Sequence, residues 1–354
     1  MIRIEELLQQ AIALDASDIF IIAGHACAFK VNGKIISTSE DKLMPADSAY
    51  LIKEIYGYVL QNKYETFLEK KDDDFSFSIP NVGRFRCNVY FQRNSQAAVL
   101  RVVKFDLPDP VELQIPKVIT DLYKIKKGMI LISGPAGCGK STTLACIIDK
   151  INQNRSVHII TIEDPIEFLH SHKKSIVSQR EVFHDTQDYL NALRSALREA
   201  PEVILVGEMR DLETINISVT AAETGHLILS TLHTMGAANT VDRMIDVFPP
   251  SQQQQIRVQL SMTLNAVISE QLVPSVDGKI IPVFEVMIVN PAIRSQIREG
   301  KIHQLENSII AGKEMGMISN DESLFELFKA GRISQETTLM YASNPERMAK
   351  KIKS

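Results

Sequence analysis

The segment from Gly134 to Ser141 combines glycines with a lysine and a hydroxyl at a spacing suited to binding phosphate. It reads Gly-Pro-Ala-Gly-Cys-Gly-Lys-Ser and follows the apolar residues Met129–Ile132. Glycines let the backbone fold round phosphate oxygens with its N–H groups pointing inward, and a following helix adds its positive end. The predicted nucleotide ligands are Gly134, Pro135, Ala136, Gly137, Cys138, Gly139, Lys140, Ser141 and Thr142.

Within this Walker A pattern, Lys140 is expected to meet the β and γ phosphates and Ser141 to bind the metal ion. The preceding strand and following helix are the context that the motif requires. The alternative is a glycine turn without a ligand, but such a turn does not need Lys followed by Ser. The expected cofactors are therefore ATP and Mg²⁺.

Two further apolar segments end in carboxylates. Val203–Val206 leads to Glu208, which we interpret as a Walker B acid acting as a metal ligand and catalytic residue, because ligands bind at the carboxyl ends of strands in open parallel sheets. Alone, such a run is equally typical of a structural strand. Ile160–Glu163 ends in Glu163, a candidate to orient or deprotonate the attacking water. The alternative there is a solvated turn, or a helix cap at Asp164.

The sequence from residue 117 onward predicts the strands and helices that would position these residues. Short apolar strands alternate with helical segments, which indicates a parallel sheet covered on both faces. The expected elements are strands at 129–133, 157–162, 203–206 and 227–231, with helices from 140 and around 189–199. After Asn290 the sequence predicts helices broken at Gly300, Gly312, Gly316 and Gly331.

The first hundred residues predict a different unit. A helix in 1–18 precedes expected strands at 19–22, 28–31, 75–79, 84–91 and 97–103, which together form a mainly antiparallel α+β unit. Prolines at 108, 110 and 116 indicate a linker. We therefore expect domains at 1–105 and 117–290, a linker at 106–116 and a helical region at 291–354.

Bulk properties fit a globular protein. The 354 residues are 45% hydrophobic and 23% charged, and the net charge of −4 gives no global attraction to nucleic acid. The apolar runs are far shorter than the ~20 residues that span a bilayer, and the amino terminus lacks a signal-peptide pattern. A cytoplasmic protein without a transmembrane segment is expected. The four cysteines show no zinc-site spacing.

The order of four motifs resembles the secretion ATPases. Walker A is followed by Glu163-Asp-Pro, Val-Gly-Glu208-Met-Arg210-Asp, and Thr-Gly-His226 to Leu-His233-Thr. Within that superfamily the chain is similar to the retraction ATPases of type IV pili. It departs from their usual patterns at Ala16–Phe20 and Lys30–Gly33, and before Walker B, where the usual Asp-Pro-Asp is Ala-Pro-Glu.

The resemblance implies a hexamer of subunits with a PAS-like amino domain and a RecA-like carboxyl domain. His226 would then sense the γ-phosphate and His233 would help shape the site, although an isolated histidine near an apolar strand is more often a core residue. Arg210 is carried over as a nucleotide-binding residue. Arg84, Arg86 and Arg101 would bring positive charge to the phosphates, the alternative being polar positions on a half-exposed strand.

The implied function is ATP-driven withdrawal of pilin from the fibre into the membrane. The expected partners are identical subunits, an inner-membrane platform protein, at whose cytoplasmic side the chain would be peripheral, and a paralogous ATPase. An accessory paralogue with weak hydrolysis is a second interpretation. A nucleic-acid translocase is a third, which the acidic charge and the family motifs disfavour.

Two smaller predictions concern Cys138 and the segment Ala292–Glu299. Cys138 is expected to be the most reactive thiol, because backbone N–H groups, a helix start and Lys140 favour thiolate; the alternative is a shielded, inert residue. In Ala292–Glu299, Ile293 and Ile297 form an apolar helix face. By resemblance this face would couple the motor to its task, unless it is only core.

Overall fold

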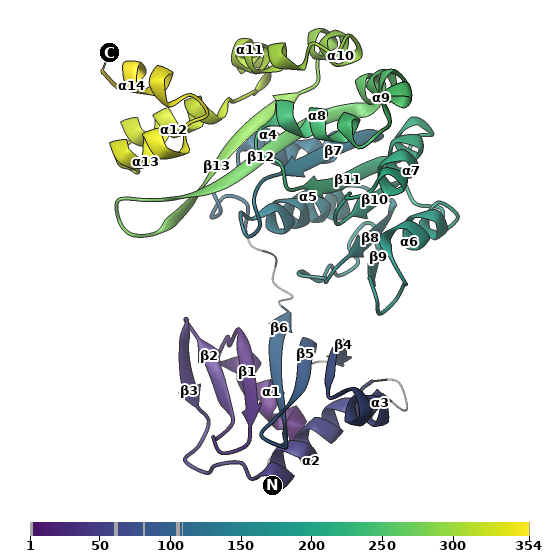
Figure 1. Ribbon diagram of the computed structural model, residues 1–354, viewed down its shortest axis with the longest axis vertical. Helices are drawn as coiled ribbons and strands as arrows, with labels where there is room; N and C mark the ends of the chain where they lie inside the picture. Colours follow the sequence, from purple (N-terminus) through teal and green to yellow (C-terminus); the bar gives the residue numbers. More distant parts are fainter. Residues whose placement is uncertain (1–2, 60–62, 81, 104–106, 108, 354) are drawn as a thin grey trace. The chain divides into compact units, whose positions relative to one another are not determined.

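The computed structural model describes residues 3–59, 63–80, 82–103, 107 and 109–353 (Figure 1). The chain divides into two compact units, one formed mainly by residues up to 106 and the other by residues from 107 onward. Residues 104–106 and 108, which include part of the expected linker and the end of the expected first domain, lie outside the described residues.

The first unit contains one sheet and three helices. Its strands are β1 (Asp18–Ile22), β2 (Ala28–Val31), β3 (Lys34–Ser37), β4 (Asp72–Ile79), β5 (Gly83–Gln92) and β6 (Ser95–Val103). Its helices are α1 (Ile4–Ala13), α2 (Pro45–Tyr56) and α3 (Lys63–Lys70). The strands pair antiparallel in the order β3-β2-β1-β6-β5-β4, which confirms the expected antiparallel α+β unit.

The period of two along β5 separates the two faces of this sheet. Phe85, Cys87 and Val89 are fully buried in the core that also receives the helices. Arg84 and Arg86 alternate with them and therefore point to the opposite face. The sequence did not predict β3, α2 or α3; β3 is exposed at all four positions, so no hydrophobic alternation marks it.

The second unit contains a seven-stranded sheet with helices on both faces. Its strands are β7 (Gly128–Ser133), β8 (His158–Glu163), β9 (Ile176–Glu181), β10 (Val203–Val206), β11 (Leu227–Leu232), β12 (Leu264–Pro274) and β13 (Ile280–Ile288). Its first helices are α4 (Lys117–Thr120), α5 (Lys140–Asn154), α6 (Tyr189–Ala196), α7 (Leu212–Glu223), α8 (Ala237–Asp246) and α9 (Pro250–Thr263). A 3-10 turn, Asp121–Lys124, follows α4.

The carboxyl-terminal part is helical, as expected. It contains α10 (Pro291–Arg298), α11 (Leu305–Ala311), α12 (Asn320–Lys329), α13 (Gln335–Tyr341) and α14 (Pro345–Lys353), with 3-10 turns at Ile302–Gln304 and Lys313–Met315. Glycines lie at or just beyond the ends of these helices. Gly316 and Gly331 have φ of 82° and 66°, the left-handed conformation that ends helices.

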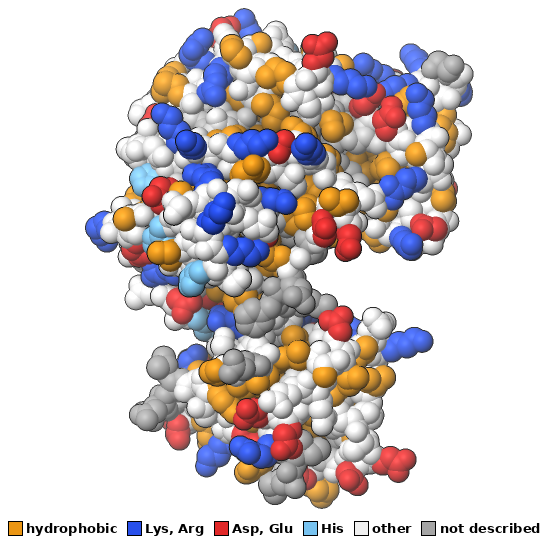
Figure 2. All heavy atoms as spheres, turned by 180° about the vertical axis from the view of Figure 1, so that it is seen from behind, with side chains coloured by type: hydrophobic (Ala, Val, Ile, Leu, Met, Phe, Trp, Pro, Cys, Tyr) orange, Lys and Arg blue, Asp and Glu red, His pale blue; other side chains and the backbone are white. Residues whose placement is uncertain are grey.

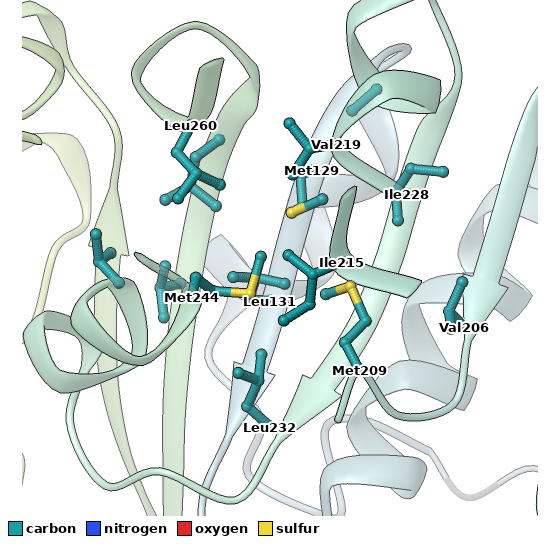
Figure 3. Packing of buried hydrophobic residues seen from close by; sticks show 14 of the residues in the cluster. Met129, Leu131, Val206, Met209, Ile215, Val219, Ile228, Leu232, Met244 and Leu260 are labelled. Carbon is teal, nitrogen blue, oxygen red and sulfur yellow. The ribbon is translucent and has the colours of Figure 1, made fainter. Parts of the chain in front are cut away.

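Strand β7 is buried on both sides because each face of the sheet is covered. Met129 and Leu131 face the core formed with α7, α8 and α9, where Ile215 and Val219 of α7 lie close by (Figure 3). Ile130 and Ile132 face the second core, formed with α5. Figure 1 shows α5 on one side of the sheet and α7 to α9 on the other.

The strand order is β13-β12-β7-β11-β10-β8-β9, and every neighbouring pair is parallel except β12 with β13, which is antiparallel. Parallel strands place their carboxyl ends at one edge of the sheet, where ligands bind in such folds. The segments after β7, β11, β10 and β8 therefore meet at this edge.

Helix α10 corrects the interpretation of Ala292–Glu299. Ile293 and Ile297 are completely buried and belong to the main core of the second unit. Arg294 donates from Nη1 to the carbonyls of Ser261 and Met262, at 2.6 and 2.9 Å, and so ties α10 to the end of α9. The apolar face of this helix is core, and it is not free to couple the motor to a partner.

No helix among the described residues is both long and apolar enough to cross a membrane. Figure 2 shows basic and acidic side chains interspersed on the face of the second unit that it presents.

Ile297→Ala should destabilise the second unit by about 2–5 kcal/mol, because it removes buried methyl groups and leaves a cavity. Arg298→Ala on the same helix, where the side chain is exposed, should change the free energy of unfolding by less than about 0.5 kcal/mol. Urea unfolding followed by circular dichroism measures both. Equal midpoints for Ile297→Ala and the native chain would contradict this assignment of α10 to the core.

Candidate nucleotide site

The phosphate-binding loop joins β7 to α5 and has the backbone conformation that its glycines permit. Gly134, Gly137 and Gly139 have φ of 144°, 77° and 109°, values that side chains disfavour. Lys140 donates from Nζ to the carbonyls of Gly134 and Pro135, both at 2.8 Å, and is only 8% exposed. The lysine is therefore folded onto its own loop, with its charge held where phosphate would arrive.

The segments after β10 and β11 bring three predicted residues together. Glu208 Oε1 lies 2.6 Å from Nε of Arg210 and 3.1 Å from Nε2 of His233. The Glu208 side chain is 15% exposed while that of Arg210 is 77% exposed. The carboxylate of Glu208 raises the pKa of Arg210 further above its usual value. Glu208, Arg210 and His233, which come from two separate sequence motifs, therefore form one cluster of contacting side chains.

Strand order fixes how these groups line the edge. β11 lies between β7 and β10, so His233 lies between the phosphate loop and Glu208. Neighbouring strands are ~4.8 Å apart, which places β7 about 10 Å from β10. Thr231 donates to the carbonyl of Gly207 at 2.6 Å, and Thr240 links Ser133 and Thr234 through hydroxyl contacts of 2.9 and 2.8 Å. These bonds hold the segments in register.

Glu163 ends β8, the strand next to β10. Its Oε1 accepts from Thr161 Oγ1 at 2.6 Å and from Gln179 Nε2 at 3.3 Å. Both donors keep the carboxylate oriented. The structure places Glu163 at the same edge as Glu208, as a water-activating role requires, and that role stays a prediction.

His226 does not join this cluster, and its expected role as a sensor of the γ-phosphate stays a prediction. It precedes β11, and its carbonyl accepts from the N–H of Gly128 at 2.9 Å, at the amino end of β7. A strand of six residues, or about 20 Å, separates it from His233. Its Nδ1 lies 3.0 Å from the carbonyl of Ala221. His226 therefore cannot contact a γ-phosphate at the loop of its own chain.

The three arginines of the first unit share one face of its sheet. Arg86 and Arg101 lie directly opposite each other on β5 and β6, and Arg84 is two residues from Arg86. Arg86 binds Asp74 through two contacts of 3.3 and 2.9 Å, and Arg101 contacts Asp18 at 3.1 Å. The Arg101 side chain is 72% exposed. The face is therefore cationic, and its role toward phosphate stays a prediction.

The structure favours the shielded interpretation of Cys138. The residue is 2% exposed, and burial raises the pKa of its thiol although Lys140 and nearby backbone N–H groups lower it in part. Loss of solvation therefore outweighs the groups that stabilise thiolate. Cys27, Cys87 and Cys146 are buried as well, and burial also raises their pKa values, so which of the four thiols is the most reactive stays a prediction.

Two residues that sequence reasoning missed lie at this edge. Glu270 of β12 accepts a hydrogen bond from Thr143 Oγ1 at 2.9 Å, beneath the phosphate loop. A carboxylate inside an apolar strand was the signal that could have indicated it. Tyr189 begins α6, and burial together with the nearby carboxylates of Asp164, Glu208 and Glu163 raises its pKa. No sequence pattern marked this tyrosine.

Comparison with known proteins places the chain in a family. The model for "Type II/IV secretion system protein" matches residues 1–286. The type IV pilus retraction ATPase PilT of Pseudomonas aeruginosa is 43% identical over 97% of this chain and 99% of that protein. The type IV pilus ATPase PilU of the same organism is 38% identical over 96% of this chain and 88% of that protein.

A solved structure agrees with these sequence relatives. The crystal structure of the pilus retraction motor PilT with bound ADP has a TM-score of 0.88 at 43% identity, and the match covers 99% of this chain and 100% of that chain. The match over both units confirms the expected α/β fold. The chain therefore belongs to the type II/IV secretion system ATPases, and within them to the type IV pilus retraction ATPases.

Proposed function

We propose that this protein is the motor ATPase that drives retraction of a type IV pilus. The observation that carries the proposal is the phosphate loop with Glu208, His233 and Glu163 at one sheet edge, in a chain that matches a retraction motor over its whole length. The crystal structure of that motor contains bound ADP, which supports nucleotide binding here.

The geometry suggests how ATP would bind. Lys140 would exchange its bonds to the Gly134 and Pro135 carbonyls for bonds to phosphate oxygens. The amino end of α5 would add the N–H groups and partial positive charge of a helix terminus. Glu163, already oriented by Thr161 and Gln179, would then accept a proton from the attacking water.

The residues present also fit Mg²⁺, which prefers oxygen ligands and keeps phosphate and water in its shell. Ser141 supplies a hydroxyl in the first turn of α5, and Glu208 supplies a carboxylate after β10. We assign these two residues to the ion, which when bound would neutralise charge on the phosphates. Glu208 would have to loosen its contacts with Arg210 and His233.

We further propose a homohexamer at the cytoplasmic face of the inner membrane, working against a membrane platform protein. The alternative is an accessory ATPase with weak hydrolysis that assembles with a main motor. The 38% identity to PilU keeps this alternative in consideration. Steady-state turnover of the purified chain separates them, because a main motor must hydrolyse ATP without a paralogue.

Lys140→Ala should reduce turnover of ATP at least about 100-fold, because it removes the charge that stabilises the phosphates in the transition state. The carbonyls of Gly134, which is buried, and Pro135 lose their donor, so a modest fall in melting temperature is expected as well. Phosphate release and circular dichroism measure the two effects. In cells, the same variant should retain pili but not retract them. Native turnover in this variant would reject the ATPase site.

Glu163→Gln should lower kcat by about 10²–10⁴-fold and leave ADP affinity within about threefold, because the amide keeps its shape but cannot accept the proton. Glu167→Gln, at an exposed position after β8, is the matched control and should keep native turnover. Single-turnover hydrolysis and ADP titration separate the steps. If Glu163→Gln lost ADP binding and kept its kcat, Glu163 would be a nucleotide-binding residue and not the group that accepts the proton.

Arg101→Ala tests whether the arginine face acts on the site of a neighbouring subunit. Chains with Arg101→Ala and chains with Lys140→Ala should each be inactive, but mixed hexamers should recover part of the ATPase rate. Recovery follows because some sites then combine an intact loop with an intact arginine. Lys30→Ala, on the neighbouring part of the same face, is the control. A mixture as inactive as its components would place the arginine and the loop in one subunit.

A further inference from the structure

Glu270 is a charged residue inside the sheet, on the strand that flanks the phosphate loop. It is 3% exposed and lies on β12, which pairs in parallel with β7 through Ile268 with Ile132 and Ser269 with Ser133. The next step of this register places Glu270 beside Gly134, where β7 ends and the loop begins.

Glu270 contacts the loop at both ends. A Cβ atom on Gly134 would lie 2.1 Å from the backbone carbonyl oxygen of Glu270, and one on Gly139 would lie 2.4 Å from its Oε1. The other carboxyl oxygen, Oε2, accepts from Thr143 Oγ1 at 2.9 Å. One residue therefore supports the first glycine of the loop, the last glycine and the first turn of α5.

The surroundings of this carboxyl disfavour its charged form. Burial raises the pKa of Glu270 to about 7, while the Thr143 hydrogen bond and the charge of Lys140 oppose the rise. The other titratable groups that face it, Cys138 and Cys146, are buried thiols whose own pKa values are raised. The contacts of this side chain with Gly139 and Thr143 depend on its shape and on its acceptor oxygens, and an amide has nearly the same shape and keeps one acceptor oxygen.

We propose that Glu270 is a positioning residue that holds the phosphate loop in its binding conformation and so sets nucleotide affinity, a role that rests on the proposed binding of ATP there. The loop itself is rich in glycine and has few side chains with which to fix its shape. Contacts with the buried Glu270 would hold the N–H groups of the loop directed at the phosphate position, so less conformational entropy is lost when nucleotide binds.

The test compares Glu270→Ala, Glu270→Gln and Gln271→Ala in the full-length chain, by titration with a fluorescent ADP analogue and by steady-state kinetics with ATP. Glu270→Ala should raise Kd and KM about tenfold while kcat changes by less than about threefold, since it leaves the Thr143 hydroxyl unpaired beneath a looser loop. Glu270→Gln should restore Kd to within about twofold.

Gln271→Ala is the matched control on the same strand. Gln271 is also buried, but it donates to Asn320 Oδ1 at 2.6 Å and to the Tyr341 carbonyl at 3.3 Å, away from the loop. It should lower the melting temperature and leave Kd unchanged. If Glu270→Ala does not fold, Thr143→Val should raise Kd about threefold, and Thr143→Ser, which keeps the hydroxyl, should not.

An unchanged Kd in Glu270→Ala or Thr143→Val would overturn the proposal. So would a Glu270→Gln variant as weak as Glu270→Ala, or an equal loss of affinity in Gln271→Ala, which would indicate a general structural effect. A native chain that bound no ADP would instead reject the proposed function itself.

Discussion

The parallel register of β7, β11, β10 and β8 is the constraint on which the rest of the site depends. Each strand is buried on both faces, so a slip by one residue would exchange the two cores and is strongly disfavoured. The same register carries Lys140, His233, Glu208 and Glu163 to one edge. Hydrophobic packing, rather than attraction between the polar groups, thus assembles the candidate site.

The polar groups at this edge are paired with one another before any phosphate arrives. Lys140 is bound by backbone carbonyls, and Glu208 by Arg210 and His233. Nucleotide binding must replace these contacts. The free energy of binding is therefore the difference between the new contacts with nucleotide and the protein contacts that are lost. That arrangement suits a motor, because a site that exchanges partners at each step can change the conformation of the segments that carry them.

The sequence predicted those parts of the site that follow directly from a local pattern. A glycine loop between strand and helix, and carboxylates after apolar strands, are determined within a few residues, so the sequence could indicate that Lys140, Glu208 and Glu163 follow the ends of strands. Glu270 and Thr143 are 127 positions apart, and only the pairing of β12 with β7 brings them together. The distance between His226 and His233 was hidden for the converse reason, because these residues are close in sequence while the whole length of β11 lies between them.

The antiparallel fold of the first unit was predictable in the same way, since alternation marks β5 and β6. Alternation does not indicate the function of the polar face. It is also absent from β3, which is exposed at all four positions. On β5 the positions that bury Phe85 and Cys87 oblige Arg84 and Arg86 to point outward, so folding alone accounts for their direction. Their identity as arginines is what folding leaves unexplained.

Charge at the nucleotide edge gives that identity a reason. Among the described residues named at this edge, Lys140 and Arg210 are the fixed cations, while Glu163, Glu208 and Asp164 are acidic. A nucleoside triphosphate would add several more negative charges, so further cations would stabilise it there. On the first unit Arg86 pairs with Asp74 and Arg101 with Asp18, and the Arg101 side chain remains largely exposed. The planar fork of an arginine binds phosphate oxygens in two places, and this is the physical reason that the predicted phosphate role offers for arginines at these positions of β5 and β6.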